Sequence, residues 1–328
     1  MRVILSSELF IQTSRNLDVL ALFQMGLEGR HRVEVEDELA SAYTNWLAQR
    51  SSYERAECQT AISNSLSMST LQPSAISVWV TGSGNSDWKP DEPRLCLQDA
   101  LDLLRRPTRV LLEDSVTDRA FLSCFLSRQE RRFIDEREQH GWLHFEHGGG
   151  VPKMRATILR SRRQWRWCHL NYFVLSDSDA LQPGRPSKAV KELNKACGQK
   201  VKYHQLSRRS IENYLPRQAL DWWKDRDSAD RSRRTKVRAF FRMSEPQRHH
   251  YNMKEGLAGD RPRATAGESA GDLYAAIEQS DRDALAEGFG PNVADLFSSA
   301  PVTESDLRSD GSWPEMEPVV ADLLTFLR

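Results

Sequence analysis

The feature that most constrains how this chain can fold is a regular alternation of strand-like and helix-like segments between residues 96 and 216. Four short apolar runs have the length and composition of buried strands: Arg109–Leu112, Trp142–Phe145, Leu170–Leu175 and Lys200–Tyr203. Before and between them lie segments with apolar residues at helical spacing: Leu97–Leu104, Thr117–Glu138, Lys153–Arg163 and Ser187–Ala196. Because alternating strands and helices are joined by right-handed crossovers, the sequence predicts an α/β domain with a mainly parallel sheet flanked by helices.

Two regions of different character flank this central domain. Residues 1–95 are mixed, with expected helices at Leu17–Leu27 and Asp37–Gln49 and an expected strand at Ile76–Val80, and the sequence assigns them no role. Residues 217–328 form a helical C-terminal region that completes the site or mediates assembly. Its expected helices are Ala219–Trp223, Lys236–Met243, Asp272–Glu278 and Glu317–Leu327, and Gly256–Gly271 is expected to be a mobile loop.

Composition limits the classes of function. The 328 residues suffice for about two domains of ordinary size. Lys+Arg and Asp+Glu both number 46, so any indication of a nucleic-acid partner must come from local charge clusters. The five cysteines are dispersed and form no Cys-x-x-Cys, which argues against a disulfide framework or a zinc ribbon. No apolar run approaches the roughly twenty residues of a membrane span, so we expect a soluble, cytoplasmic protein without a membrane partner.

Acidic residues follow three of the four predicted strands of the central domain. They are Glu113, Asp114 and Asp118 beyond the first strand, Asp177 and Asp179 beyond the third, and Glu212 beyond the fourth. Parallel strands end at one edge of their sheet, where open α/β sheets bind ligands, so these carboxylates are expected to converge. Converging carboxylates repel one another unless a cation lies between them. Mg²⁺, or Mn²⁺ in its place, is the expected ion because it prefers oxygen ligands.

Each acid also has a purely structural interpretation. An Asp-x-Asp after a strand is commonly a turn or a helix cap. Glu113 could be a surface acid, and Glu212 could pair with Arg208 or Arg209. Because acids follow three strands of one predicted sheet, a shared site is favoured.

A basic segment lies beside the predicted site. Between Gly148 and Ser176 there are six basic residues and no acid, with Trp165, Trp167 and His169 interleaved. The six are Lys153, Arg155, Arg160, Arg162, Arg163 and Arg166. Basic groups neutralise phosphates and aromatic faces stack on bases, so we expect nucleic-acid binding here. A solvated helix face is the alternative.

The glycine run His147–Gly150 closes the second predicted strand. It is either a tight turn or a place where the backbone approaches a phosphate. No Gly-x-Ser-x-Gly elbow accompanies it, which argues against an esterase.

Four short motifs resemble those of Toprim nucleases. Val110–Glu113, followed by Asp118, resembles the opening Toprim motif, a strand that ends in Glu with an Asp at the start of the next helix. Phe173–Asp179 resembles the Asp-x-Asp motif. Arg209–Leu215 looks like the third signature of nucleases related to the OLD (overcoming lysogenization defect) family, and His250–Gly256 resembles their late basic motif. The resemblance covers roughly residues 96 to 256.

The opening motif departs from the common form of this family. Asp114 follows Glu113 where the family has Gly, and the spacing from Glu113 to Asp118 is one residue longer. A gapless match would instead put Asp114 in the place of the family's Glu, with Ser115 in the place of its Gly. Either Glu113 or Asp114 is thus the first ligand, and the intact later motifs favour a working site.

The resemblance implies a role for each of these residues. The carboxylates that would ligate one or two Mg²⁺ ions, ~3.5–4 Å apart where there are two, are Glu113 or Asp114, Asp177, Asp179 and Glu212. Asp118 would be a further ligand or would orient water. Lys254 would stabilise charge that develops on the phosphate. Activated water then serves as the nucleophile.

The sequence therefore predicts a Mg²⁺-dependent nuclease that hydrolyses phosphodiester bonds of DNA or RNA. Many OLD-type nucleases are joined to or paired with an ATPase. Because this chain has no Walker A sequence, the resemblance implies an ATPase on another polypeptide, as in two-component anti-phage defence systems. The alternative is a catalytically weak Toprim-like regulatory or scaffold subunit that docks on such an ATPase. Chain length and cysteine spacing argue against a topoisomerase or primase fragment.

Restraint of the nuclease by assembly is a further expectation. Residues 1–95 and the C-terminal helices would then form a homo-oligomer or dock on the partner. Val320, Leu323, Leu324 and Leu327 share one face of an expected helix. They either line such an interface or pack in the core of the monomer.

Overall fold

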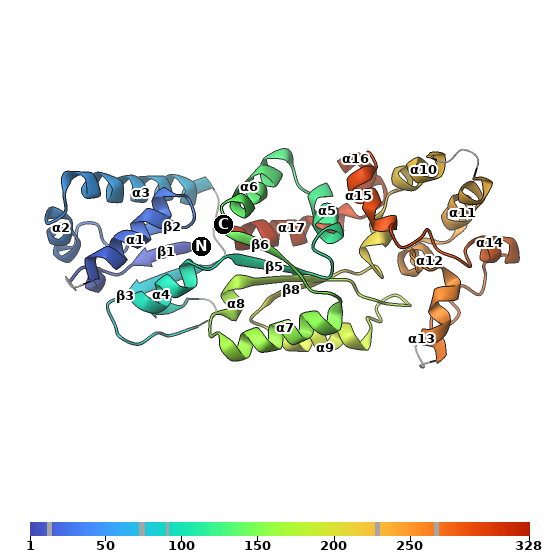
Figure 1. Cartoon of the computed structure of the whole chain (residues 1–328), viewed down its shortest axis with the longest axis horizontal. Coiled ribbons are helices and arrows are strands. Elements are labelled where there is room, and N and C mark those ends of the chain that lie inside the picture. The colour runs from blue at the N-terminus through green and yellow to red at the C-terminus, as the bar shows by residue number, and fades with distance from the viewer. Residues whose placement is uncertain (12–14, 72–75, 90–91, 227–229, 266–268) are drawn as a thin grey trace.

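The chain folds around two separate sheets of four strands each, and every strand pairing in both sheets is parallel. The structure, a computed structural model, describes residues 1–11, 15–71, 76–89, 92–226, 230–265 and 269–328. The two sheets follow one another along an elongated molecule, and a helical region lies beyond the second sheet (Figure 1). The expected α/β class, with parallel strands flanked by helices, is confirmed.

The first sheet belongs to an α/β unit, where the sequence indicated only a mixed region. Its strands lie in the order β2-β1-β3-β4, with bounds Arg2–Leu5 (β1), Arg32–Val35 (β2), Ser77–Thr81 (β3) and Arg94–Cys96 (β4). Its helices are η1 (Ser7–Ile11), α1 (Asn16–Leu27), α2 (Ser41–Ala48), α3 (Ser52–Leu71) and α4 (Leu97–Leu104). Helix α4, expected at the start of the central domain, packs against α1 and β3 and so lies with this unit.

Several elements of this unit, among them β1, β2 and α3, were not expected from the sequence. Each strand has four residues, and Arg2 and Glu34 pair between them, with Nη2 and Oε2 2.7 Å apart. Charged residues neutralised by such pairing interrupt the apolar pattern of a strand. The buried positions of α3, Cys58, Ala61, Ile62 and Ser65, have helical spacing, but all except Ile62 have small side chains, which leave a faint apolar periodicity.

The second sheet is the central sheet that the sequence predicted. Its strands lie in the order β6-β5-β7-β8, with bounds Thr108–Leu112 (β5), Leu143–His147 (β6), Tyr172–Ser176 (β7) and Lys202–Gln205 (β8). Val110 of β5 lies beside Phe145 of β6 and Phe173 of β7. All four predicted strands are present, with ends shifted by a few residues. In both sheets the first strand is internal, the second lies on one side of it, and the third and fourth lie on the other.

Helices cover both faces of the second sheet. Those on one face are α7 (Val151–Gln164) and α9 (Lys188–Cys197), and those on the other are α5 (Thr117–Cys124), α6 (Arg128–Gln139) and α17 (Trp313–Leu327). Side chains alternate along β7, so Val174 faces α7 and α9 whereas Phe173 and Leu175 face the opposite core. The sheet is therefore buried on both faces, as parallel sheets are.

The single helix expected over Thr117–Glu138 is wrong, because α5 ends at Cys124 and α6 begins at Arg128. Ser127 starts the second helix with a capping box, in which its Oγ accepts the Glu130 N–H and the Glu130 carboxylate accepts the Ser127 N–H at 2.8 Å. A Ser-x-x-Glu sequence is a helix start signal. This signal marks the boundary between α5 and α6, although the apolar residues of the two helices keep a helical spacing across it.

The C-terminal region consists of short helices, as expected. They are α10 (Arg217–Asp225), α11 (Arg231–Arg242), α12 (Glu245–His250), α13 (Arg261–Thr265), α14 (Gln279–Ala284), α15 (Leu296–Ser299) and α16 (Glu304–Ser309). The expected helix at Asp272–Glu278 is wrong, since turns occupy this stretch and the helix starts at Gln279. The expectation of a mobile loop over Gly256–Gly271 falls partly on residues 266–268, which lie outside the described residues. Elsewhere this stretch holds η4 (Leu257–Asp260) and α13.

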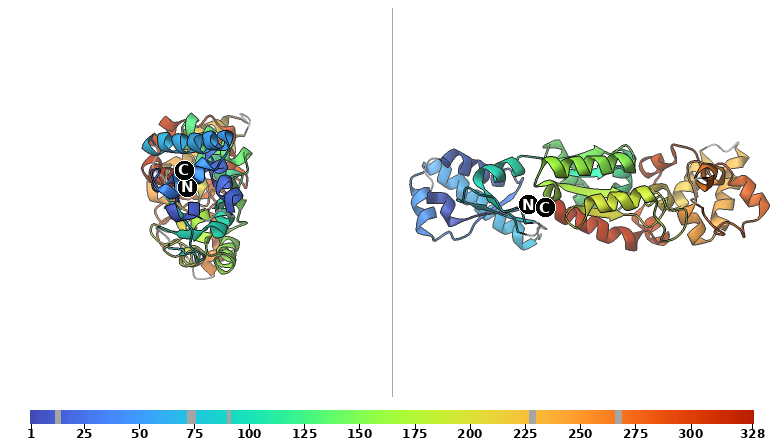
Figure 2. Two further views of the ribbon diagram at one scale, coloured as in Figure 1. Left: turned by 90° about the vertical axis from the view of Figure 1, so that its left-hand side faces the viewer. Right: turned by 90° about the horizontal axis from the view of Figure 1, so that it is seen from below.

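The last helix, α17, returns to the central sheet after the helical region (Figure 1). Its residues Val320, Leu323, Leu324 and Leu327 are buried within the monomer. The ring of Phe326 lies 5.9 Å from that of Phe173 in β7. Of the two alternatives for this helix face, packing in the core of the monomer is the one that the structure shows. Figure 2 shows both chain ends between the two sheets, where the Met1 amino group donates to the Arg328 carbonyl at 2.8 Å.

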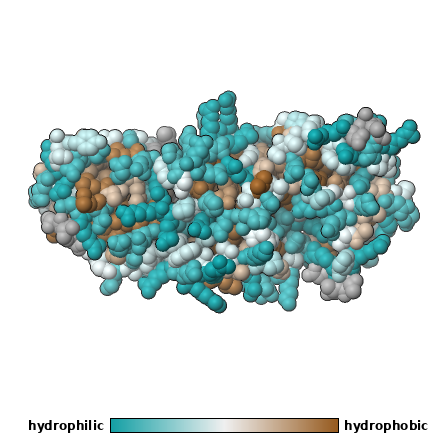
Figure 3. Space-filling model, viewed as in Figure 1, coloured by the Kyte–Doolittle hydropathy of each residue, from teal (hydrophilic) through white to brown (hydrophobic). Residues whose placement is uncertain are grey.

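Among the described residues, no helix combines the length and the apolar character that a membrane span requires. The face in Figure 3 is largely hydrophilic, with apolar residues in small separate areas.

Replacing Leu323 by alanine tests the structural role of α17. Because Leu323 is fully buried in the core, we expect the free energy of unfolding to fall by about 3 kcal/mol, as measured by urea denaturation. Glu317→Ala, on the exposed side of the same helix, should change it by no more than about 0.5 kcal/mol. If the decrease in the free energy of unfolding of Leu323→Ala depends on protein concentration, this helix face forms an interface between copies instead.

Candidate metal centre

Backbone N–H groups join the acids at the carboxyl edge of the central sheet. Glu113 follows β5 and Asp177 follows the neighbouring β7. The Asp177 N–H donates to Glu113 Oε1 at 3.1 Å, and the Ile211 N–H donates to Asp177 Oδ1 at 2.9 Å. Three segments that are remote in sequence are thus joined around two carboxylates.

Glu212 lies in the short 3-10 helix η3 (Ile211–Tyr214), and its side chain is only 2% exposed. Its Oε1 pairs with the half-exposed Lys254, at 2.9 Å from Nζ. Its Oε2 is buried and has no hydrogen-bond partner among the described residues. A buried carboxylate oxygen without a partner is costly unless a proton or a cation occupies it.

The acids lie close enough to one another that their charges help to raise the pKa values of Glu113, Asp118 and Asp177. We call Glu113, Asp118, Asp177, Asp179 and Glu212 the carboxylate cluster. Burial raises the pKa of Glu113 to about 8, and Asp179 and Asp118 add to the shift. Burial raises the pKa of Asp177 well above its usual value, and Glu113 and Glu212 add to that shift. Burial also raises the pKa of Asp118 to about 7. The cluster thus carries unfavourable negative charge that a cation would relieve.

No group of three or more His, Cys, Asp or Glu side chains within the described parts of the chain is arranged to hold a metal ion as it stands. Lys254 neutralises part of the cluster through Glu212. The chemistry of the donors still suits a hard divalent cation, because they are carboxylates, two of which, Glu113 and Asp177, have raised pKa values, and because Glu212 Oε2 has no partner within the described chain. Ligation would require side-chain rotations that bring the oxygens together.

The structure separates the roles of Glu113 and Asp114. Asp114 Oδ1 accepts the N–H groups of Val116, at 2.8 Å, and Thr117, at 3.0 Å, so this carboxylate caps the start of α5. The hydrogen bond from Thr117 is the main reason that the pKa of Asp114 is lowered. Asp118 Oδ2 accepts the Asp114 N–H at 3.1 Å. Glu113, rather than Asp114, therefore faces Asp177 and the rest of the carboxylate cluster.

Asp179 ends the Asp-x-Asp turn in a left-handed conformation, with a φ of 50°. Aspartate tolerates this conformation better than most side chains do. The Asp179 N–H donates to the Arg209 carbonyl at 2.9 Å, and the Ser178 hydroxyl donates to the Arg208 carbonyl at 2.7 Å. These bonds attach the turn to the segment that carries Glu212.

Buried ion pairs that the sequence did not predict hold the Glu212 segment in place. Arg209 forms a double hydrogen bond with Asp260, at 2.6 and 2.8 Å, and Arg208 pairs with Asp310 at 2.6 Å. The alternative in which Glu212 pairs with Arg208 or Arg209 is therefore wrong. Asp260 lies in the stretch expected to be a mobile loop, and sequence spacing gives no signal that pairs it with Arg209.

Asn213, beside Glu212, anchors the same segment to the chain that leads to Lys254. Its Nδ2 donates to the carbonyls of Arg248, at 2.8 Å, and Tyr251, at 2.9 Å. Lys254 itself is held against Gly288, where an added Cβ would lie 2.4 Å from the Lys254 carbonyl. Glycine at 288 thus permits the close backbone approach that positions Lys254.

The glycine run after β6 packs against the end of β5. The N–H groups of Gly148 and Gly149 donate to the carbonyls of Leu112, at 2.7 Å, and Glu113, at 3.0 Å. A Cβ at Gly148 would lie 2.7 Å from the Leu112 carbonyl oxygen. The run is a tight turn that supports the backbone of Glu113, and these two N–H groups are already used within the protein.

The basic segment extends away from the carboxylate cluster. All six predicted nucleic-acid-binding residues are exposed, and five of them are on or at the end of α7 beyond its first turn. Lys153 lies near the start of α7, beside Gly149, whereas Arg163 lies ~15 Å further along the helix axis. Arg155 pairs with Glu192 at 3.6 Å, and Arg162 donates to the Ala196 carbonyl. Only the start of α7 adjoins the site.

The interleaved tryptophans are packed within the protein. The rings of Trp165 and Trp167 stack with centroids 4.9 Å apart, and the guanidinium of Arg106 lies 4.6 Å from the Trp167 ring. Trp167 is buried, so it offers no open face for a base. The expectation that this aromatic side chain stacks on bases is wrong.

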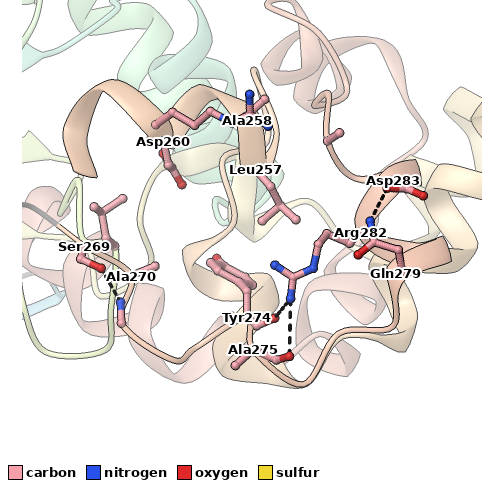
Figure 4. A pocket seen from close by; sticks show the side chains of 14 residues that line it. Leu257, Ala258, Asp260, Ser269, Ala270, Tyr274, Ala275, Gln279, Arg282 and Asp283 are labelled. Carbon is pink, nitrogen blue, oxygen red and sulfur yellow. Dashed lines mark hydrogen bonds between the residues drawn. The ribbon is translucent and has the colours of Figure 1, made fainter. Parts of the chain in front are cut away.

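Two cavities lie on the Asp179 side of the cluster. One, of about 560 Å³, lies in the C-terminal region beside Asp260. Figure 4 shows Leu257, Tyr274 and Arg282 around it, with Arg282 directed at the backbone carbonyls of Tyr274 and Ala275. The other, of about 330 Å³, lies between the start of α9 and Arg263.

Comparisons of this chain with protein-family models, with curated proteins and with solved structures find no match.

Removing one charge from the carboxylate cluster should stabilise the protein at alkaline pH without divalent cations. A carboxyl group with a raised folded pKa favours folding below its ordinary pKa, and that contribution is lost as the pH rises through the folded value, here about 8 for Glu113. Asp177→Asn keeps the acceptor for the Ile211 N–H. In EDTA near pH 8 we expect the free energy of unfolding of Asp177→Asn to exceed that of the wild type by on the order of 1–2 kcal/mol.

Asp114→Asn is the matched control, for which we expect the free energy of unfolding to change in the opposite direction. Because hydrogen bonds lower the pKa of Asp114, removing its charge should lower the free energy of unfolding at pH values above the ordinary pKa of an aspartate. Adding Mg²⁺ should stabilise the wild type more than Asp177→Asn. Urea denaturation across the pH range measures both effects, and a destabilised Asp177→Asn near pH 8 would contradict mutual repulsion in the cluster.

The Arg209–Asp260 pair should be essential for stability. Asp260→Ala leaves a buried guanidinium without its carboxylate, so we expect a loss of about 3–5 kcal/mol in urea denaturation. Glu304→Ala breaks the exposed pair with Arg308 and should cost at most about 0.5 kcal/mol. Equal losses for the two variants would show that the buried pair does not hold the Glu212 segment.

Proposed function

We propose that this protein is a Mg²⁺-dependent nuclease that hydrolyses phosphodiester bonds of DNA or RNA. One observation carries the proposal: carboxylates from three separate segments meet at the carboxyl edge of a parallel sheet, and Glu212 keeps a buried oxygen that has no partner among the described residues. Such an edge is where α/β sheets bind ligands. The electrostatic repulsion in the cluster favours a bound cation, which a phosphodiester can share.

Glu113, Asp177 and Glu212 would hold the ion, with Asp179 as a further ligand. Bound Mg²⁺ neutralises phosphate charge and makes water a better nucleophile. Asp118, at the buried start of α5, would orient that water or add a ligand. The fixed backbone bonds to Glu113 and Asp177 keep two of these side chains near their working positions before substrate binds.

Lys254 is suited to contact the substrate. Burial acts to lower the pKa of Lys254, but the carboxylate of Glu212 and its neighbours outweigh this effect, so the pKa is raised and the ammonium stays charged. Its side chain is half exposed. When a cation takes its place at Glu212, Lys254 can donate to a phosphate oxygen and stabilise charge that develops there.

A second candidate function is a regulatory or scaffold role for a catalytically weak Toprim-like domain. The ion pair between Lys254 and Glu212 favours it, together with the lack of a ready group of metal ligands within the described residues. We include a partner ATPase, cytoplasmic location and a role in anti-phage defence in the proposal on the resemblance of the motifs alone. Metal-dependent cleavage by the purified chain separates the two functions.

Cleavage of DNA and RNA oligonucleotides with Mg²⁺, with Mn²⁺ and with EDTA tests the nuclease. We expect cleavage with either metal and none with EDTA. Asp177→Asn and Glu212→Gln remove ligand charge at nearly constant shape, so each should lower the rate by roughly 10³-fold or more. Glu317→Gln, on the exposed face of α17, should cleave at the wild-type rate. A wild type that folds and binds Mg²⁺ but cleaves neither substrate would favour the scaffold role.

A further inference from the structure

A basic cavity of about 330 Å³ lies next to the Asp-x-Asp turn. Four of the side chains that line it are cationic: Arg185, Lys188, Lys191 and Arg263. Among the described residues that line it, none is acidic. The described lining of this cavity is therefore positively charged.

Both walls of the cavity are attached to the carboxylate cluster by backbone contacts. On one side, the Ser187 N–H at the start of α9 donates to the Ser178 carbonyl at 3.0 Å. On the other side, Arg263 donates to the Asp179 carbonyl at 3.1 Å. The residues that supply these two carbonyls lie within the Asp-x-Asp turn. The distance between the cavity and the cluster is thus fixed by the fold.

Three of the four cations that line the cavity carry charge that no carboxylate of the described residues neutralises. Arg185, Lys188 and Lys191 are exposed, and none of them pairs with a carboxylate of the described residues. By contrast, Arg155 on α7 pairs with Glu192, on the same helix as Lys188. Like charges around one cavity repel, and an anion between them removes that repulsion.

We infer that this cavity is a phosphate subsite, which binds the backbone of the nucleic-acid strand next to the phosphodiester at the carboxylate cluster. The inference rests on the proposed function. A polyanion that approaches five acids needs cations along its path, and the exposed Arg185, Lys188 and Lys191 supply them. The shared chemistry of DNA and RNA, a phosphodiester oxygen, is what the subsite recognises.

Binding of fluorescent single-stranded DNA and RNA oligonucleotides of one sequence, in EDTA, tests the subsite without hydrolysis. We expect Lys188→Glu/Lys191→Glu to weaken binding at least ~10-fold near 0.1 M salt and to lower the slope of log K against log salt by ~1.4–1.8, for two lost phosphate contacts. Lys195→Glu, an exposed residue of the same helix outside the cavity, should change the affinity by less than about twofold. Circular dichroism checks that the variants fold.

The outcomes separate the subsite from the nuclease proposal. An unchanged affinity and slope for the double variant, an equal loss for Lys195→Glu, or no binding of either oligonucleotide by the wild type would overturn the subsite. Loss of binding in the double variant supports the subsite even if the wild type cleaves nothing, in which case the nuclease proposal alone fails. Cleavage that persists with unchanged binding in the double variant retains the nuclease and rejects the subsite.

Discussion

The repulsion among the carboxylates at one edge of the central sheet is the constraint on which the rest of the site depends. Burial and mutual charge raise the pKa values of Glu113, Asp118 and Asp177, so this edge would favour a more open arrangement if nothing opposed it. Two backbone N–H groups and the ammonium of Lys254 oppose it. Such a cluster lowers the stability of the folded protein. Groups with strongly shifted pKa values of this kind are typical of functional sites.

Ion pairs between distant segments hold the cluster together from outside. Arg208 and Arg209 precede Glu212, and their partners, Asp310 and Asp260, lie much later in the chain. The C-terminal region therefore completes the site instead of merely following it. It supplies Lys254, the acid that fixes Arg209, and the helix α17 that covers one face of the central sheet.

The two sheets show that a shared topology does not create a shared site. Both have the same strand order relative to the chain, yet the carboxyl edge of the first sheet carries different side chains. Glu36, after β2, accepts the Ser7 N–H beyond β1 at 3.2 Å. Among the described residues, no hydrogen bond or ion pair at that edge brings several acids together. Function depends on the side chains that a sheet edge carries, not on the order of its strands.

The sequence by itself determined the central domain. Its strands are continuous apolar runs and its helices have clear periodicity, and both signals are local. Acids directly after strands also predicted which residues would meet, because parallel strands end at one edge. The choice between Glu113 and Asp114 needed the structure, since it depends on which carboxylate caps α5.

Only the tertiary structure decided the rest. The short strands of the first unit and the mostly small buried residues of α3 give faint sequence patterns. These elements therefore depend on the segments that pack against them. The pairing of Arg209 with Asp260, the burial of the α17 face and the basic cavity beside Asp179 join residues that are far apart in the chain. Spacing along a sequence describes neighbours on one helix or strand, whereas charge pairing and burial depend on which elements the fold brings together.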